Sequence, residues 1–598
     1  MSKGNHARFA CLVTLLALLA ARPASAQVSL VGEWSPRYHE DQIDRIPGPD
    51  LGDYTGLPLT PGARLAADSW DAARLTLREH QCKVHISPYI YHGPLQVRIW
   101  EEKDPRTQQV IAIRNYVNTY EQERTIWMDG RSHPPPWAPH TWMGFATGTW
   151  EGDILTVYTT HIKQEWIRRN GVPNSEKSTM IEHFIRHGNI MTHVVQWTDP
   201  VYLTEPLIRT EDFVLNDRPA GNWLWPCEYV DEIPDRTHTA VPHYLPGRSP
   251  FAGEFAYKFG VPVEAANGGI ETTYPEYQSR LRTLPKPARP APGTPNPQLS
   301  TAPPASARAA DWGGNGEIDT FKVQGSVYLL VGAGGNIAVQ TGDEGVLVVD
   351  TGLAAHADTV LAAIRKLSDK PIRYVINTHF HADHTGGNDT IGKAGSNVQG
   401  GPTTVIAHEN VLDRMSAPFG KTPARPADAW PTDTFILDEK DLFFNNEPIF
   451  IHHDAAGHTD GDSIVLFRRS DVIVSGDAFV MDNYPMIDAS NGGGVQGVID
   501  GLNRLLDLAV PAHEQEGGTY IIPGHGRVCD EADVLEYRDM VTIVRDRIQD
   551  MVTRGLTLDQ VKAARPTLDY DLHFGTGARG WTTEMFIDAM YRDLSKKR

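Results

Sequence analysis

Short segments in which apolar and polar residues alternate dominate the chain from residue 27 to about residue 235. Four of them are bounded by turn residues such as Asp-Gly, Glu-Gly and Asp-Pro: 124–131, 143–150, 153–160 and 190–198. Alternation with a period of two indicates strands with one buried face, and tight turns between them indicate hairpins. The pattern predicts a mainly antiparallel β domain, built as a barrel or a sandwich.

This pattern ends between residues 236 and 310. Residues 236–284 read as irregular, and residues 285–308 are rich in Pro, Ala, Ser and Thr. A segment with many prolines and few large apolar side chains cannot build a core, and behaves as an extended linker. We therefore expect one domain at 27–235, a connector at 236–310 and a second domain at 311–598.

From residue 311 onwards, apolar strands alternate with segments of helical spacing. The predicted strands are 326–331, 336–341, 346–350, 372–377, 448–452, 463–467, 472–475 and 519–522, and the predicted helices are 355–367, 497–508, 531–555 and 582–594. Such an alternation indicates an α/β domain with sheets covered by helices. Residues 332–335, although rich in glycine, join two strands, so we interpret them as a hairpin turn and not as a phosphate loop.

The first 26 residues have the order of a secretory signal peptide. Lys3 and Arg8 precede the apolar run 9–21, and Ala24-Ser25-Ala26 forms a small-residue cleavage site. The run is too short to span a bilayer comfortably, so no membrane span is expected. We expect an exported protein, periplasmic or secreted if the source is bacterial. In that oxidising setting Cys82 and Cys227 could pair, leaving Cys529 free.

Composition restricts the class of partner. The 598 residues exceed one ordinary domain, and 40% hydrophobic with 22% charged residues is ordinary for a folded protein. The formal net charge of −20 argues against nucleic-acid binding. A small-molecule substrate is the expected partner, and the oligomeric state is left open.

Three histidines and one aspartate crowd into residues 379–384, directly after the apolar run 374–376. His379 and His381, two apart in extended chain, can point the same way, while Asp383 and His384 turn elsewhere and could hold a second ion. The alternative is a polar loop with surface histidines. Three further ligand-type side chains each follow an apolar strand: His458, Asp477 and His525.

This ordered set, with Val348-Val349-Asp350-Thr351-Gly352 upstream, resembles the metallo-β-lactamase fold superfamily over about half of the chain. The resemblance implies a four-layer αββα fold. It assigns one metal ion to His379, His381 and His458, and a second to Asp383, His384 and His525. Asp477 would bridge the two ions, and Asp350 would orient the ligand loop from outside.

The ligand set implies hydrolysis. Two adjacent cations would hold a bridging hydroxide at neutral pH, which would attack a carbonyl, and Asp383 could orient the water or shuttle its proton. Flavodiiron proteins of this fold generally have Glu where His381 stands, so two Zn²⁺ are expected in preference to iron or manganese. The carboxylate of Asp477 is similar to glyoxalase II-like thioesterases and lactonases. An ester, thioester or lactone is therefore favoured over a β-lactam.

The front half resembles lipocalin-like β-barrel domains of exported bacterial proteins, through residues 127–134 and 148–153. Trp137, Trp142 and Trp166 could line a mouth that holds an apolar ligand, although packing is the more ordinary role for such rings. Six scattered histidines lack ligand spacing and are read as structural: His133, His140, His161, His183, His187 and His193.

Two other functions stay open beside the hydrolase. The first is a binding protein whose barrel captures an apolar ligand and whose metal site is structural. The second is an iron-dependent sulfur dioxygenase. Specificity would come from loops near the cleft: residues 417–433 as a rim, and Tyr484 or Asn491 as oxyanion donors, with loop packing as the equal alternative.

Overall fold

The computed structural model describes residues 28–37, 49–91, 96–117, 122–216, 227–230, 240–287, 317–418, 424–512, 514 and 517–596. The expected signal peptide and nearly all of the Pro/Ala-rich linker lie outside these residues. None of the helices described here is both long enough and apolar enough to cross a membrane.

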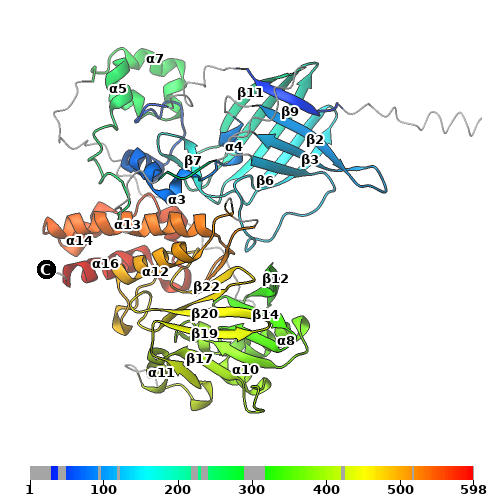
Figure 1. Cartoon of the computed structure of the whole chain (residues 1–598). Helices are drawn as coiled ribbons and strands as arrows, with labels where there is room; N and C mark the ends of the chain where they lie inside the picture. The colour runs from blue at the N-terminus through cyan, green and yellow to red at the C-terminus, as the bar shows by residue number, and fades with distance from the viewer. Residues whose placement is uncertain are drawn as a thin grey trace, which may run out of the picture.

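Nine strands of the N-terminal part close into a barrel (Figure 1). Their order is β1-β11-β10-β9-β6-β5-β4-β3-β2. The bounds are β1 Gly32–Pro36, β2 Val97–Lys103, β3 Val110–Val117, β4 Gln122–Trp127, β5 Phe145–Glu151, β6 Ile154–Thr160, β9 Thr179–His187, β10 Ile190–Thr198 and β11 Leu207–Leu215. The predicted barrel is confirmed. One pair is not antiparallel: β4 and β5 run parallel, because residues 128–144 cross back along the domain between them.

Side chains fill the inside of the barrel. Trp34, Phe184 and Phe213 belong to an apolar cluster drawn from strands all round the barrel. Within it, the buried Arg124 guanidinium pairs with the Glu182 carboxylate. The tryptophans expected at the mouth are packed: Trp137 against Phe321 of the C-terminal part, at 5.1 Å between ring centroids, and Trp166 against Trp70 at 5.8 Å. Trp142 packs against a buried cluster that also contacts Leu572.

Short elements surround the barrel. They are the ribbon β7 Glu165–Arg168 with β8 Val172–Asn174, the helices α2 Pro61–Ser69, η2 Ala72–Thr76, α3 Arg78–Gln81 and α4 Ser87–Ile90, and a second group α5 Glu254–Phe259, α6 Val263–Ala266, η3 Ile270–Thr273 and α7 Pro275–Leu281. The prediction of irregular chain throughout 236–284 was therefore wrong for 254–281. The helices there are too short to give a clear period. Cys82 and Cys227 form a disulfide, which confirms the expected pair, and Cys529 is free and buried.

Two facing sheets form the centre of the C-terminal part. The first contains β12 Asp319–Gln324, β13 Val327–Val331, β14 Ile337–Gly342, β15 Gly345–Val349, β16 Ile372–Ile376, β17 Thr404–His408 and β18 Asp433–Phe435; the second contains β19 Glu439–Phe444, β20 Glu447–Asp454, β21 Asp462–Phe467, β22 Val472–Gly476 and β23 Tyr520–Pro523. One apolar cluster, including Leu347 and Val465, joins their inner faces.

Helices cover both outer faces. On the first sheet lie η4 Ala354–His356, α8 Ala357–Leu367, α9 Ala382–Thr385, α10 Asn388–Ala394, α11 Glu409–Ser416 and η5 Ala427–Ala429; on the second lie η6 Ala489–Asn491, α12 Val495–Leu508, α13 Glu531–Thr553, α14 Leu558–Ala564, α15 Asp571–Phe574, η7 Ala578–Gly580 and α16 Thr583–Lys596. Separate apolar clusters join each helical layer to its sheet. The expected αββα order is confirmed.

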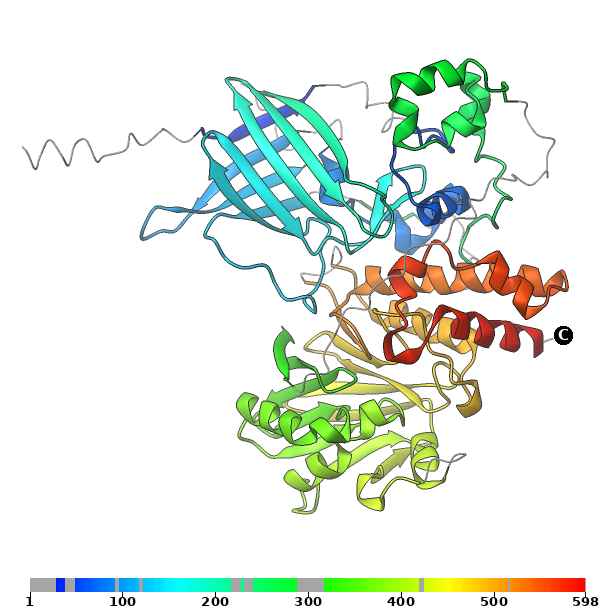
Figure 2. The ribbon, with the colours of Figure 1, turned by 180° about the vertical axis from the view of Figure 1, so that it is seen from behind.

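The helical layer on the second sheet also contacts the N-terminal part. Figures 1 and 2 both show α13 between the sheets and α3. Across this boundary His80 binds Asp539 at 2.9 Å, and Arg538 donates to Glu79 at 2.8 Å. Lys163 binds Asp533 at 2.9 Å. Buried and partly buried ion pairs therefore join the two parts.

His140 makes this boundary sensitive to acid. Burial and, to a smaller extent, the nearby Arg527 guanidinium lower the pKa of its imidazole to about 3. In the unfolded chain the same group has a pKa of about 6.5, so below that pH the unfolded state binds a proton that the folded state does not. As the pH is lowered from 6 to 4, we expect the titration of His140 to reduce the free energy of unfolding by about 1.4 kcal/mol per pH unit.

Urea unfolding at pH 7, 5.5 and 4.5 checks this prediction. The His140→Gln variant should show a shallower fall than the wild type. His187→Gln, at an exposed strand end, serves as the control. Equal slopes for wild type and His140→Gln would contradict it.

Candidate metal centre

The seven predicted ligands meet at one edge of the two sheets. His379 and His381 follow β16, His384 lies in α9, and His458 lies in the turn between β20 and β21. Asp477 and His525 follow β22 and β23, which are parallel neighbours, so their carboxyl ends lie side by side. The approach is close: a Cβ atom on Gly524 would lie 2.0 Å from Oδ1 of Asp477, so only glycine fits there.

The structure brings His379, His381 and His458 together. One nitrogen from each ring lies within 4.8 Å of the other two. Nε2 of His458 faces Nδ1 of His381 at 2.8 Å. His379 and His458 are buried, whereas His381 is partly exposed. These nitrogens form one three-ligand group.

Asp383, His384 and His525 form a second group. One ligand atom from each of these side chains lies within 4.8 Å of the other two. Nε2 of His525 lies 3.2 Å from Oδ2 of Asp383 and 3.4 Å from Nε2 of His384.

Asp477 lies between the two groups. Its Oδ1 is 3.3 Å from Nε2 of His384 and 3.5 Å from Nε2 of His525, and its Oδ2 is 3.7 Å from Nε2 of His458. Each oxygen of one carboxylate thus faces a different group, as a bridging ligand requires.

Asp350 orients this arrangement from outside. Its Oδ2 accepts from Nδ1 of His384 at 2.7 Å, which leaves Nε2 of that ring to face the other ligands. The same carboxylate accepts from the backbone N–H and the hydroxyl of Thr378, at 2.8 and 2.7 Å. Asp350 therefore fixes both a ligand tautomer and the start of the ligand loop.

Two further contacts that orient candidate ligands were not predicted from the sequence. Nε2 of His381 binds Oδ2 of Asp488 at 3.2 Å, and Nδ1 of His458 donates to the carbonyl of Met486 at 2.7 Å. Asn491 does not point to a substrate site, since its amide donates to Oδ2 of Asp488 at 2.7 Å. The only sequence signal was the position of this loop shortly after Asp477.

Metal ions fit this donor set. Nε2 of His379 and Oδ1 of Asp477 are buried without a hydrogen-bond partner, which is costly unless an ion or another group satisfies them. Burial lowers the pKa of His379 well below its usual value and that of His458 to about 4, so both rings are neutral and present lone pairs. Burial would raise the pKa of Asp477, but His525 and His384 hold it well below its usual range. Neutral imidazoles and ionised carboxylates are the forms that ligate divalent metals.

A comparison with protein-family models finds a match to the metallo-β-lactamase superfamily at residues 324–525. The chain contains a metallo-β-lactamase domain. The match covers His379 through His525, so all seven predicted ligands lie within it.

Among curated proteins, this chain is 26% identical over 260 residues to a linear primary-alkylsulfatase of Pseudomonas sp. (strain ATCC 19151), covering 36% of this chain and 47% of that protein. The chain thus spans about half the length of this relative. A solved stereoselective inverting sec-alkylsulfatase of Pseudomonas sp. is 17% identical, with 46% of this chain and 50% of that chain covered and a TM-score of 0.36. A metallo-β-lactamase from Pontibacter korlensis is 15% identical, with 38% and 99% covered and a TM-score of 0.30.

The candidate metal centre is most exposed at His381 and Asp383, whose side chains are 20% and 28% exposed. Met486, which binds His458, and Leu353, near Asp383, are exposed apolar side chains. The Arg579 guanidinium donates to both oxygens of Asp482 at 2.7 and 3.1 Å. Burial lowers the pKa of Arg579, but Asp482, Asp477 and Asp383 raise it overall, so this cation lies within electrostatic range of the metal centre.

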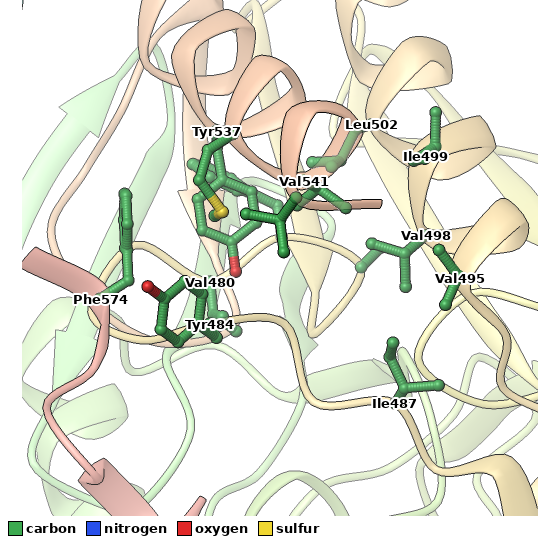
Figure 3. Close-up of a cluster of buried hydrophobic side chains, with 14 of the residues drawn as sticks. Val480, Tyr484, Ile487, Val495, Val498, Ile499, Leu502, Tyr537, Val541 and Phe574 are labelled. Atoms are coloured by element: carbon green, nitrogen blue, oxygen red, sulfur yellow. The ribbon is translucent and has the colours of Figure 1, made fainter. Parts of the chain in front are cut away.

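Tyr484 does not serve as an oxyanion donor. Figure 3 shows its ring in an apolar cluster with Val480 and Phe574. Its hydroxyl donates to the Thr567 carbonyl at 3.2 Å and to Asp571 at 3.0 Å. The packing alternative is therefore correct. Part of the expected rim at 417–433, residues 419–423, lies outside the described residues.

Replacing Asp488 by Asn should weaken metal binding about tenfold, because the amide is a poorer acceptor for the His381 ring and leaves that ligand less well oriented. Metal affinity measured by competition with a chromophoric chelator checks this. Asp460→Asn is the control, since that carboxylate pairs with Arg414 and not with a ligand. Unchanged affinity in Asp488→Asn would show that the contact does not orient His381.

Proposed function

We propose that the C-terminal domain is a metal-dependent hydrolase that cleaves an ester-type bond of a small molecule. The observation that supports this most strongly is the position of Asp477, with one carboxylate oxygen toward each of two three-ligand groups. His379, His381 and His458 would hold one divalent ion, and Asp383, His384 and His525 the other. Such a pair of ions supplies Lewis acidity and an activated water.

The residues of this chain would divide the remaining work. Asp350 and Asp488 bind one ring nitrogen of His384 and of His381, which leaves the other nitrogen of each ring to hold an ion. Asp383 is the most exposed of the carboxylates in the centre, and its depressed pKa keeps it ionised at neutral pH. As an ionised acceptor on the exposed side of the centre, it is suited to orient the attacking water. Burial of the histidine and aspartate ligands on the inner side excludes bulk solvent from that side.

The substrate we favour is a carboxylic ester, thioester or lactone, because a carboxylate at the Asp477 position is similar to that of hydrolases with such substrates. A β-lactam is less favoured. A sulfate ester is the second candidate, and two observations favour it. One is the similarity to a linear primary-alkylsulfatase. The other is the Arg579 cation within electrostatic range of Asp477 and Asp383, in a domain that also exposes the apolar Leu353 and Met486. Such groups suit a substrate with an anionic group and an apolar part.

Two further proposals follow from the ligands and the disulfide. The imidazole-rich donor set favours zinc over iron or manganese. The Cys82–Cys227 bond supports export, because disulfides persist in oxidising compartments.

A substrate panel with metal analysis of the same sample tests the function. The zinc-loaded full chain is offered an ester, a thioester, a lactone, a β-lactam and a linear alkyl sulfate of matched chain length. We expect about two ions per chain and turnover of one of the first three. Arg579→Met distinguishes the second candidate, since it should impair cleavage of the alkyl sulfate far more than that of a neutral ester. No turnover of any member by metal-loaded protein would contradict the proposal.

A further inference from the structure

The segment that carries His525 is held on one side by its own domain. The amide of Asn336 donates to the carbonyls of Pro523 and Gly526, at 2.9 and 3.0 Å. The backbone N–H of Met481 donates to the His525 carbonyl at 2.9 Å. Gly526 has a φ of +104°, so the chain turns sharply directly after the ligand. These contacts fix the segment 523–526 up to the turn.

Residues of the barrel domain hold the other side. The backbone N–H of Val528 donates to the Trp137 carbonyl at 3.0 Å. The Nε of Arg527, two residues after His525, donates to Oε2 of Glu176 at 2.7 Å, and its Nη2 lies 2.6 Å from the same oxygen. Glu176 follows β8 in the sequence. A metal-ligand segment of one domain is thus bound by a carboxylate 351 residues earlier in the chain.

This contact lies in a buried network of charges. The Arg527 side chain is 2% exposed, and its Nη1 and Nη2 also donate to Asp533 at 3.0 and 2.8 Å. The second oxygen of Glu176 faces Nε2 of the buried His573 at 3.2 Å. Burial would raise the pKa of Glu176, but Arg527 and His573 hold it well below its usual range. Because the buried Arg527 guanidinium donates to a carboxylate on each side, Glu176 and Asp533, it has one favoured position. It therefore also fixes the backbone that carries it.

We propose that Glu176 of the barrel domain is a positioning residue for His525, so that the barrel completes the second metal site. Through Arg527, Glu176 fixes the chain on the far side of the Gly526 turn, and His525 is then held between two anchored points. Support of the His525 segment would then be one role of the barrel domain, independent of any ligand in the barrel. This inference rests on the metal centre proposed above.

The other ion pairs across the domain boundary provide a control. Glu79 accepts from Nη2 of Arg538 at 2.8 Å and, with 15% of its side chain exposed, is nearly as buried as Glu176 at 11%. Arg538 lies on α13, 13 residues after His525, and none of the seven ligands is its neighbour in sequence. Removal of the Glu79 charge is therefore expected to disturb the boundary but not the ligand segment.

The test compares wild type, Glu176→Ala, Glu176→Gln and Glu79→Gln as full chains. Each is titrated with zinc against a chromophoric chelator to separate the two binding steps. We expect Glu176→Ala to weaken the second step about tenfold and leave the first unchanged. Glu176→Gln keeps an acceptor oxygen for Arg527, so its second-step affinity should fall less than that of Glu176→Ala. Glu79→Gln should match the wild type.

Hydrogen–deuterium exchange of the peptide around residues 520–530, on metal-free protein, gives a second readout. Faster exchange there in Glu176→Ala but not in Glu79→Gln supports the proposal. Equal exchange and equal second-step affinity in Glu176→Ala and wild type would overturn it, as would equal losses in Glu176→Ala and Glu79→Gln. If wild-type protein binds fewer than two ions, the proposed function fails, while exchange at this segment still decides the positioning role.

Discussion

Asp477→Asn is expected to lose one of the two metal ions and about 10³-fold in kcat/KM. The change keeps the volume of the side chain but removes the charge that both three-ligand groups face at 3.3 to 3.7 Å. An amide offers one oxygen, so it cannot serve both ions, and its NH₂ group would point at a cation or an imidazole. Loss of one ion removes several kcal/mol of transition-state stabilisation, which corresponds to a rate effect of this size.

The same strand provides a matched control. Asp471 precedes β22 as Asp477 follows it, and the Asp471 residue is buried. Asp471 has a φ of +54°, a conformation that Asn tolerates, and its Oδ1 accepts from Thr519 at 2.7 Å. Asp471→Asn should therefore keep both ions and most of the activity. Metal analysis and kcat/KM measured on both variants decide the matter: two ions and full activity in Asp477→Asn would exclude a bridging role.

The candidate ligands could be predicted from the sequence because they follow the ends of four apolar strands, β16, β20, β22 and β23. His379, His458, Asp477 and His525 are each placed by a local rule, namely that a strand ends and the next side chains lie at the edge of a sheet. The αββα layers were predictable for the same reason, since α8, α12, α13 and α16 are long enough to show a period.

Contacts that depend on how loops return could not be predicted in this way. Asp488 binds His381 across 107 residues and Asn491 donates to Asp488, and no spacing rule distinguishes either from other loop residues. Glu176 and Arg527 are 351 residues apart in the sequence and belong to different domains. The parallel pairing of β4 with β5 likewise depends on the path of residues 128–144, which have no periodic pattern. Local sequence pattern was enough to predict the secondary-structure elements and the candidate ligands. The contacts that hold those ligands in place depend on the tertiary fold.

Arg124→Met is expected to destabilise the barrel by about 3–5 kcal/mol, because it leaves the Glu182 carboxylate buried without its cation. Both side chains are almost fully buried, and Nη1 of Arg124 donates to Oε1 of Glu182 at 2.8 Å. Burial would raise the pKa of Glu182, but Arg124 brings it to about 2, below its value in the unfolded chain. The pair therefore contributes its stability above about pH 4.5 and loses it as the pH falls toward 2.

A double-mutant cycle with Arg124→Met, Glu182→Leu and the double variant separates the lost pair from the lost packing. At pH 7 the double variant should be more stable than Arg124→Met, because it leaves no unpaired charge in the barrel. The gap between wild type and Arg124→Met should narrow as the pH falls toward 2, because the unpaired Glu182 of the variant is protonated before the paired Glu182 of the wild type. Urea unfolding followed by tryptophan fluorescence measures these differences. A loss below about 1 kcal/mol in Arg124→Met would mean that water or His193, which faces Oε1 of Glu182 at 2.9 Å, compensates the charge.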